Sequence, residues 1–171
     1  MKKIAILIGA SNNKGNTRSL AQYVADKTNA TIYNLNNYTI SPFDYQHKNI
    51  DDDFIPLVES LLSYDHIIFA SPVYWYCMSA QMKVFFDRMS DLLHVKKELG
   101  RELRGKSSSV ISTGSTVNPE RSFEEVFINS FDYLGVKYKG MIYCYCEHNF
   151  DLADHEKIVN QKTNELSIAL N

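Results

Sequence analysis

The residues best suited to bind a ligand lie between Gly9 and Thr17, directly after an apolar run. The hydroxyls of Ser11 and Thr17, the Asn16 amide and free backbone amides at the start of a following helix would surround a phosphate with donors. The segment lacks both the Gly-Lys-Ser/Thr end of a Walker loop and the Gly-x-Gly-x-x-Gly spacing of a dinucleotide fingerprint. It therefore predicts either a cradle for the terminal phosphate of a mononucleotide or a plain turn whose polar residues cap a helix.

Three aromatic residues follow one another at Tyr74, Trp75 and Tyr76, shortly after Pro72. One short loop cannot point all three rings into a core, and a flat aromatic ligand beside them would gain stacking and apolar burial. Pro72 stiffens this turn and would help to aim backbone groups at the polar edge of such a ligand. A subunit interface, where Tyr and Trp are enriched, is the alternative, and the two interpretations are compatible.

A third polar segment covers residues 112–116, with the sequence Ser-Thr-Gly-Ser-Thr. Gly114 would let its backbone approach a flat ligand closely. Such turns are common, so the segment gains meaning only from its place beside the other two. That place depends on the elements that position all three.

These elements begin with short apolar runs that recur at regular spacing: Ile4–Ile8, Thr31–Leu35, His66–Ala70, Ser109–Thr113 and Lys137–Tyr145. Stretches with helical periodicity alternate with them, and the clearest has Asn118 as a cap, Pro119 in the first helical position and Gly135 after its end. The alternation predicts a single domain over residues 1–171 with a flavodoxin-like three-layer α/β/α sandwich and a five-stranded parallel sheet in the order 2-1-3-4-5. The three polar loops then meet at the carboxyl ends of the strands, where such sheets bind ligands.

Composition narrows the partners of this 171-residue chain. Its 20 acidic and 18 basic residues give a formal net charge of -2, without the basic surplus that drives binding to nucleic acid. The chain has three cysteines, a small and odd number, whereas a secreted disulfide framework has a denser, even-numbered set. The cysteine count therefore favours the cytoplasm. The first apolar run ends at Gly9, too early for a signal peptide or a membrane span. The polar stretch from Asn36 to Asn49 is a long connection that could cover one edge of the site.

Other candidate chemistries are weaker. Cys144 and Cys146 alternate on a strand without a matching Cys or His cluster, so packing is favoured over a metal site. His148, after the fifth strand, is the histidine placed nearest to the predicted site, although a solvent-facing loop position is the simpler interpretation. Lys83 and Asp87 stand four residues apart and predict a surface ion pair. No residue is assigned a catalytic role.

The segments Ile8–Thr17 and Ser71–Arg88 resemble the NADPH-dependent FMN reductase branch of the flavodoxin-like superfamily. The second is the more specific, and the final third of the chain matches only as architecture. The resemblance implies that Ser11, Asn16 and Thr17 hold the FMN phosphate, that Pro72, Val73, Tyr74 and Trp75 line the isoalloxazine, and that Thr113, Gly114 and Ser115 face them. Relatives often carry arginine where this chain has Asn12, so a positive charge toward the phosphate is expected from Lys14 or Arg18.

The resulting hypothesis is an FMN-dependent NAD(P)H oxidoreductase, working as a homodimer, that passes electrons to a quinone, a nitro or azo compound, or a flavin. Hydride would enter and leave through the cofactor in a ping-pong reaction, with no protein nucleophile. A flavodoxin-type electron carrier is the first alternative, although a net charge of -2 offers little field to steer basic protein partners. A flavin-free binding module on the same fold is the second, supported by Asn12.

Overall fold

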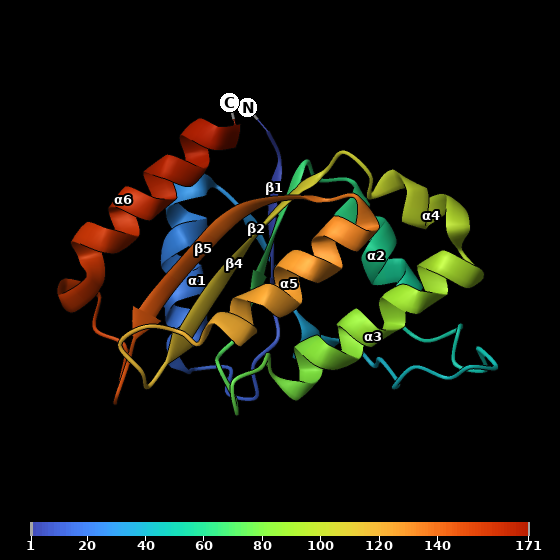
Figure 1. Cartoon of the computed structure of the whole chain (residues 1–171), viewed down its shortest axis with the longest axis horizontal. Coiled ribbons are helices and arrows are strands. Elements are labelled where there is room, and N and C mark those ends of the chain that lie inside the picture. Colours follow the sequence, from blue (N-terminus) through green and yellow to red (C-terminus); the bar gives the residue numbers. More distant parts are fainter. Residues whose placement is uncertain (1, 171) are drawn as a thin grey trace.

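The central sheet of the computed structural model, which describes residues 2–170, has five parallel strands with helices on both faces (Figure 1). The strands are β1 (Ile4–Ile8), β2 (Thr31–Asn34), β3 (His66–Ala70), β4 (Ser107–Gly114) and β5 (Lys137–Tyr145), in the spatial order β2-β1-β3-β4-β5. All four neighbouring pairs are parallel. The flavodoxin-like sandwich and the strand order predicted from the sequence are confirmed.

The helices divide between the two faces because successive residues of a strand point to opposite sides. They are α1 (Asn16–Thr28), α2 (Phe54–Leu62), α3 (Ala80–His94), α4 (Lys97–Glu102), α5 (Arg121–Leu134) and α6 (Leu152–Leu170). Apolar residues of α1 and α6 pack with Ile6 of β1 in one core cluster, whereas those of α2, α3 and α5 pack with Leu7 in the other. Every residue of β1 and β3 is buried, as expected of central strands covered on both faces.

Four elements differ from the sequence prediction, and the first is β4, which runs from Ser107 to Gly114 rather than from Ser109 to Thr113. Strand β2 ends at Asn34, and Leu35 begins a 3₁₀ turn in which the Asn34 side chain accepts a hydrogen bond from the Asn36 amide. Helix α4 was not expected, because none of its residues is buried and it has no apolar stripe. Helix α5 begins at Arg121, so Asn118 and Pro119 precede it rather than cap it. Its predicted end is confirmed, since Gly135 closes it with a φ of 72° in the left-handed region.

The connection between β2 and α2 is anchored to helix α3 by one buried cation. Arg88 is fully buried and donates to the Asp91 carboxylate (2.6 Å), the Asp52 carboxylate (2.5 Å) and the carbonyls of Ser41 (3.0 Å) and Asn49 (3.2 Å). Burial opposes its charge, but the two carboxylates outweigh burial and raise the pKa of Arg88. The guanidinium therefore stays charged and fixes this long segment along α3.

Candidate functional site

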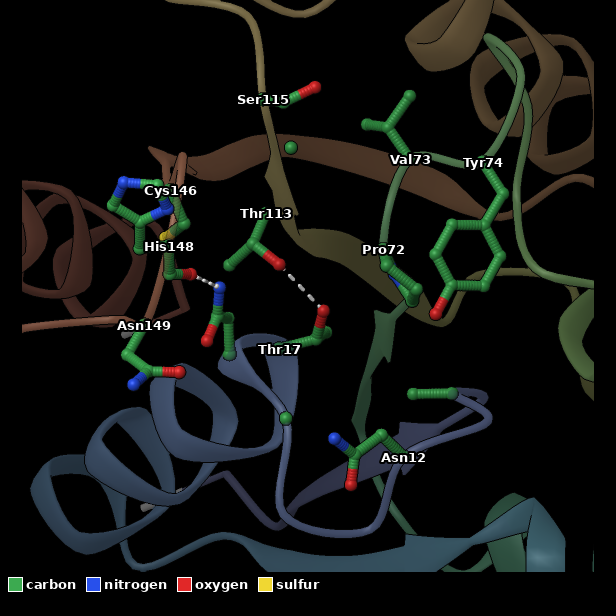
Figure 2. Close-up of a pocket in the computed structure, with 14 residues that line it drawn as sticks. Asn12, Thr17, Pro72, Val73, Tyr74, Thr113, Ser115, Cys146, His148 and Asn149 are labelled. Atoms are coloured by element: carbon green, nitrogen blue, oxygen red, sulfur yellow. Dashed lines mark hydrogen bonds between the residues drawn. The ribbon is translucent and has the colours of Figure 1, made fainter.

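A pocket of about 510 Å³ lies at the carboxyl ends of the strands, and Figure 2 shows the side chains around it. Four loops contribute, those that follow β1, β3, β4 and β5. The lining residues are Ala10, Asn12, Gly15, Asn16, Thr17, Pro72, Val73, Tyr74, Thr113, Gly114, Ser115, Cys146, His148 and Asn149. The pocket thus occupies the switch point of the sheet, where ligands of open α/β folds bind.

One end of the pocket is the start of helix α1. Gly15 takes the N-cap position without a side-chain cap, and the first turn of the helix contains no acidic residue. Its free amides and the positive end of the helix dipole therefore remain available to an anion. Gly9, just before this loop, must be small because a Cβ there would lie 2.9 Å from the Met82 Cβ. The loop is thereby held tightly against the start of α3.

Buried hydroxyls connect this loop to the segment after β3. The Ser79 hydroxyl donates to the Gly9 carbonyl (2.6 Å) and accepts from the Met82 amide at the start of α3 (3.2 Å). The Ser71 hydroxyl accepts from the Ser79 amide (2.9 Å) and donates to the Pro72 carbonyl (3.0 Å). Buried hydrogen bonds therefore fix these two walls of the pocket relative to one another. Such bonds are stronger in the protein interior than in water.

The aromatic segment forms a tight hairpin. Tyr74 and Cys77 exchange backbone hydrogen bonds in both directions, at 2.9 and 3.0 Å. Between them Trp75 and Tyr76 have φ angles of 48° and 64°, in the left-handed region that bulky residues avoid. Only Tyr74 of the three aromatics lines the pocket, and the Trp75 side chain is 93% exposed at the tip. Such strain is characteristic of functional loops.

The loop after β4 closes the pocket through close packing. The Thr113 and Thr17 hydroxyls are hydrogen-bonded at 2.8 Å, and both residues are buried (Figure 2). A Cβ at Gly114 would lie 2.8 Å from the Tyr143 hydroxyl and 3.3 Å from Val73. Glycine is thus required here by neighbouring side chains, in addition to any ligand that approaches the backbone.

Asn16 faces the pocket but uses its carboxamide on the chain itself. Its Nδ2 donates to the His148 carbonyl (2.6 Å), and its Oδ1 accepts from the Phe150 amide (2.9 Å). These two bonds hold the loop that follows β5 against the start of α1. Figure 2 shows the one to the His148 carbonyl as a dashed line. Asn16 therefore positions a wall of the pocket, whereas the sequence suggested a direct donor to phosphate.

Four predicted site residues do not line the pocket: Ser11, Lys14, Arg18 and Trp75. The Ser11 hydroxyl accepts from the Gln81 side chain (3.2 Å), and the Arg18 guanidinium donates to Gln22 further along α1 (3.3 Å). Lys14 is exposed. Residues 36–49, a possible cover for the site, contribute nothing to its described lining, although Asn36 donates to the Ala10 carbonyl (2.7 Å).

The loop after β5 is the wall that sequence reasoning missed, apart from His148. Cys146 and Asn149 join His148 in the lining, and burial raises the pKa of the Cys146 thiol, so the thiol stays protonated. Cys77, Cys144 and Cys146 are all free thiols. Within residues 2–170 no group of three or more His, Cys, Asp or Glu side chains is arranged to hold a metal ion. The pocket offers dipoles and flat apolar surface.

The strand order and the pocket at the switch point define a flavodoxin-like α/β protein. Residues 2–149 match the family model described as NADPH-dependent FMN reductase. The chain belongs to that family, whose members are NAD(P)H-dependent FMN oxidoreductases. It is 30% identical over 155 residues to YwqN of Bacillus subtilis (strain 168), which is named as an NAD(P)H-dependent FMN-containing oxidoreductase, and the match covers 82% of this chain and 83% of that protein.

Solved structures agree on the fold. The Trp repressor binding protein from Bacillus subtilis matches with a TM-score of 0.76 and 24% identity, over 96% of this chain and 97% of that chain. An FMN-dependent NADH-azoreductase from Bacillus anthracis str. Ames Ancestor, solved in complex with FMN, matches with a TM-score of 0.71 and 11% identity, over 99% of this chain and 100% of that chain. In the described part of this chain, no helix is both long and apolar enough to cross a membrane.

Proposed function

We propose that this chain binds FMN in the pocket and passes electrons from NAD(P)H to a small oxidised acceptor. The observation that carries the proposal is the combination, in one pocket of about 510 Å³, of a free helix N-terminus with a wall formed by Pro72, Val73 and Tyr74. The first suits a phosphate and the second suits a flat heterocycle. The volume is in the range of ordinary cofactor sites.

The residues present fit this cofactor. Backbone amides at Asn16 and Thr17 would receive the phosphate, while residues 72–74 and 113–115 would flank the isoalloxazine from two loops. When bound, FMN supplies the hydride chemistry, and the chain binds, orients and shields it. The fixed loops described above serve this purpose, because a preorganised site loses little freedom when the ligand enters.

The acceptor class is a quinone, a nitro or azo compound, or free flavin, reduced after NAD(P)H has left the same open face in a ping-pong sequence. The name of the B. subtilis relative supports an enzyme of this kind. The formal net charge of -2 also favours an enzyme over a carrier, because it gives little long-range attraction toward basic protein partners. We further propose a cytoplasmic homodimer, supported by the free thiols and by the exposed aromatic hairpin.

The purified protein tests this proposal directly. It should be yellow, or become so with added FMN, and anaerobic stopped-flow mixing with NADPH or NADH should bleach the flavin absorbance within seconds. A protein that binds FMN but is reduced by neither nucleotide is a carrier. A colourless protein that does not bind added FMN at micromolar concentration would leave only the fold.

A further inference from the structure

The lining of the pocket contains a single side chain that can become positively charged near neutral pH. No Lys, Arg, Asp or Glu is among the described residues that line it, and His148 is its one histidine. Lys14 and Arg18, the two cations expected from the sequence, lie outside the lining, and Arg18 is bonded to Gln22. A bound phosphate would therefore meet helix amides and hydroxyls, with His148 as the one ionisable cation of the pocket wall.

The position of His148 is fixed beside the helix start that receives anions. Its carbonyl accepts the Asn16 amide at 2.6 Å, and Asn16 is the first residue of α1. The second Asn16 bond, from the Phe150 amide at 2.9 Å, fixes the chain on the other side of the histidine. The imidazole is exposed at the rim of the pocket and lies beside Cys146 (Figure 2). A charge there adds to the field of the α1 dipole.

No carboxylate in the described lining of the pocket would neutralise a charge on His148. The first turn of α1 contains no acid, and the β4 loop contributes only Thr113, Gly114 and Ser115. Directly after β5, burial raises the pKa of the Cys146 thiol. Glu147 accepts from the Tyr145 hydroxyl (2.8 Å), Asp151 accepts from the Ala153 amide (2.9 Å), and His155 stacks on Phe150.

We propose that protonated His148 is the cation that pairs with the cofactor phosphate, so that the preference of this protein for FMN over riboflavin depends on pH. The inference rests on the proposed function, because it assumes that the phosphate lies at the α1 start. Histidine is the side chain whose charge changes in the physiological pH range, whereas an arginine or lysine would keep its charge throughout that range. Retention of the phosphorylated flavin is then stronger in mildly acidic conditions.

Equilibrium titrations of flavin-free protein, followed by quenching of flavin fluorescence, test this directly. The ligands are FMN and riboflavin, each at pH 6.0 and pH 8.5, and the proteins are wild type, His148→Gln, His148→Lys and His155→Gln. His155 is the matched control, since it lies one helical turn into α6, outside the pocket lining. Comparing variants at one pH removes the titration of the phosphate itself, which also occurs near pH 6.

At pH 6.0 we expect wild type to bind FMN about threefold to fivefold more tightly than His148→Gln, the range of a solvent-accessible ion pair. At pH 8.5 that advantage disappears, whereas His148→Lys keeps it. Riboflavin affinity is the same in all four proteins, and His155→Gln behaves as wild type. An equal ratio of wild type to His148→Gln at both pH values, or an equal loss for riboflavin, overturns the inference.

The same titrations distinguish failure of the His148 role from failure of the proposed function. If wild type binds FMN and is reduced by NAD(P)H while His148→Gln binds FMN equally well at pH 6.0, the proposed function stands and the role of His148 is wrong. If none of the four proteins binds either flavin, the proposed function itself fails. Circular dichroism of each variant establishes that the fold is intact.

Discussion

At the scale of single residues, Asn16 shows how a side chain can shape a pocket through hydrogen bonds to the chain itself. Both ends of its carboxamide are occupied by backbone groups of the loop after β5. Losing these two hydrogen bonds would loosen that loop from α1 and widen the pocket, because among the described residues no other hydrogen bond joins residues 148–150 to the helix start. The residue therefore acts on the ligand through the wall it holds.

Asn16→Ala should lower the affinity for FMN about tenfold or more and cost about 2 kcal/mol of unfolding free energy, since two hydrogen bonds of about 1 kcal/mol are lost. Asn13→Ala is the matched control. The Asn13 Oδ1 also accepts two bonds, from Asn34 (2.9 Å) and Asn36 (2.8 Å), yet Asn13 does not line the pocket. Fluorescence titration and urea denaturation of both variants check this. Equal FMN affinity in the two variants would contradict the assigned role.

Arg88 illustrates a residue whose importance lies in its burial. Arg88→Met leaves the Asp52 and Asp91 carboxylates without their cation and should cost about 3–5 kcal/mol of unfolding free energy. Lys83→Met, on the same helix, removes an exposed pair with Asp87 and should cost less than about 1 kcal/mol. Chemical denaturation of both variants measures the contrast, and similar losses would show that Arg88 does not anchor the connection between β2 and α2.

At the scale of elements, the hairpin of residues 74–77 holds two bulky residues in left-handed conformations. A two-residue turn of this kind favours Asn-Gly. Trp75→Asn combined with Tyr76→Gly should therefore raise the unfolding free energy by about 1–2 kcal/mol, because the strain is relieved. The same variant should turn over acceptors more slowly or lose its dimer, measured by steady-state kinetics and sedimentation velocity. Unchanged turnover and assembly would make the aromatic pair an ordinary surface feature.

Strand β3 begins with a buried histidine that makes stability depend on pH. Burial, with smaller contributions from Lys139 and Lys2, lowers the pKa of His66 to about 4, and its Nδ1 is hydrogen-bonded to Ser107 at 2.9 Å. In the unfolded chain the same group titrates near pH 6.5, so between these values only the unfolded state takes up the proton. Stability contributed by neutral His66 is therefore lost as the pH falls below about 6.5.

At pH 5.0 this loss amounts to about 2 kcal/mol relative to pH 7.5, at 1.36 kcal/mol for each pH unit below 6.5. Urea denaturation at the two pH values should show it in wild type. His66→Asn cannot titrate, so its pH dependence should be smaller by that amount even though it is less stable throughout. An identical pH dependence in both proteins would mean that His66 is protonated in the folded state.

The elements that could be predicted are those with a strong apolar pattern. Strands β1, β3 and β5 have the bounds expected from the sequence. For β1 and β3 the reason is that buried parallel strands read as continuous apolar runs. Helix α4 was not predicted because none of its residues is buried. The start of α5 was placed too early because Asn118 and Pro119 are good capping residues, whereas in the structure they belong to the preceding loop. Local preference without burial is a weak signal.

The pocket residues divide in the same way. Thr17, Thr113 and residues 72–74 were found because they lie at the carboxyl ends of strands, in the loops that follow or at the start of the next helix, and these strand ends must meet. The two hydrogen bonds of Asn16 to the loop after β5 span sequence separations of 132 and 134 positions. No local sequence pattern indicates such bonds. The buried set around Arg88 was missed for the same reason, since its partners Asp52 and Asn49 lie 36 and 39 positions away in the sequence. Long-range polar bonds depend on the finished fold.

At the scale of the whole molecule, the first and last helices are joined at the site. Helix α1 begins at the pocket, and Asn16 at its first residue bonds to the segment that leads directly into α6. The two helices also pack together on one face of the sheet (Figure 1). Helix α6 is therefore part of the support of the pocket, although none of its described side chains lines it.

A linkage follows from this arrangement, because a ligand that binds only the closed pocket must also oppose local opening of whatever closes it. Saturating FMN should slow amide hydrogen–deuterium exchange in residues 152–166 severalfold, at a distance from the flavin, as followed by mass spectrometry. Asn16→Ala should abolish that protection while α5 exchanges as before. The first and last helices would then open locally together in the flavin-free protein, and FMN binding would suppress the opening of both.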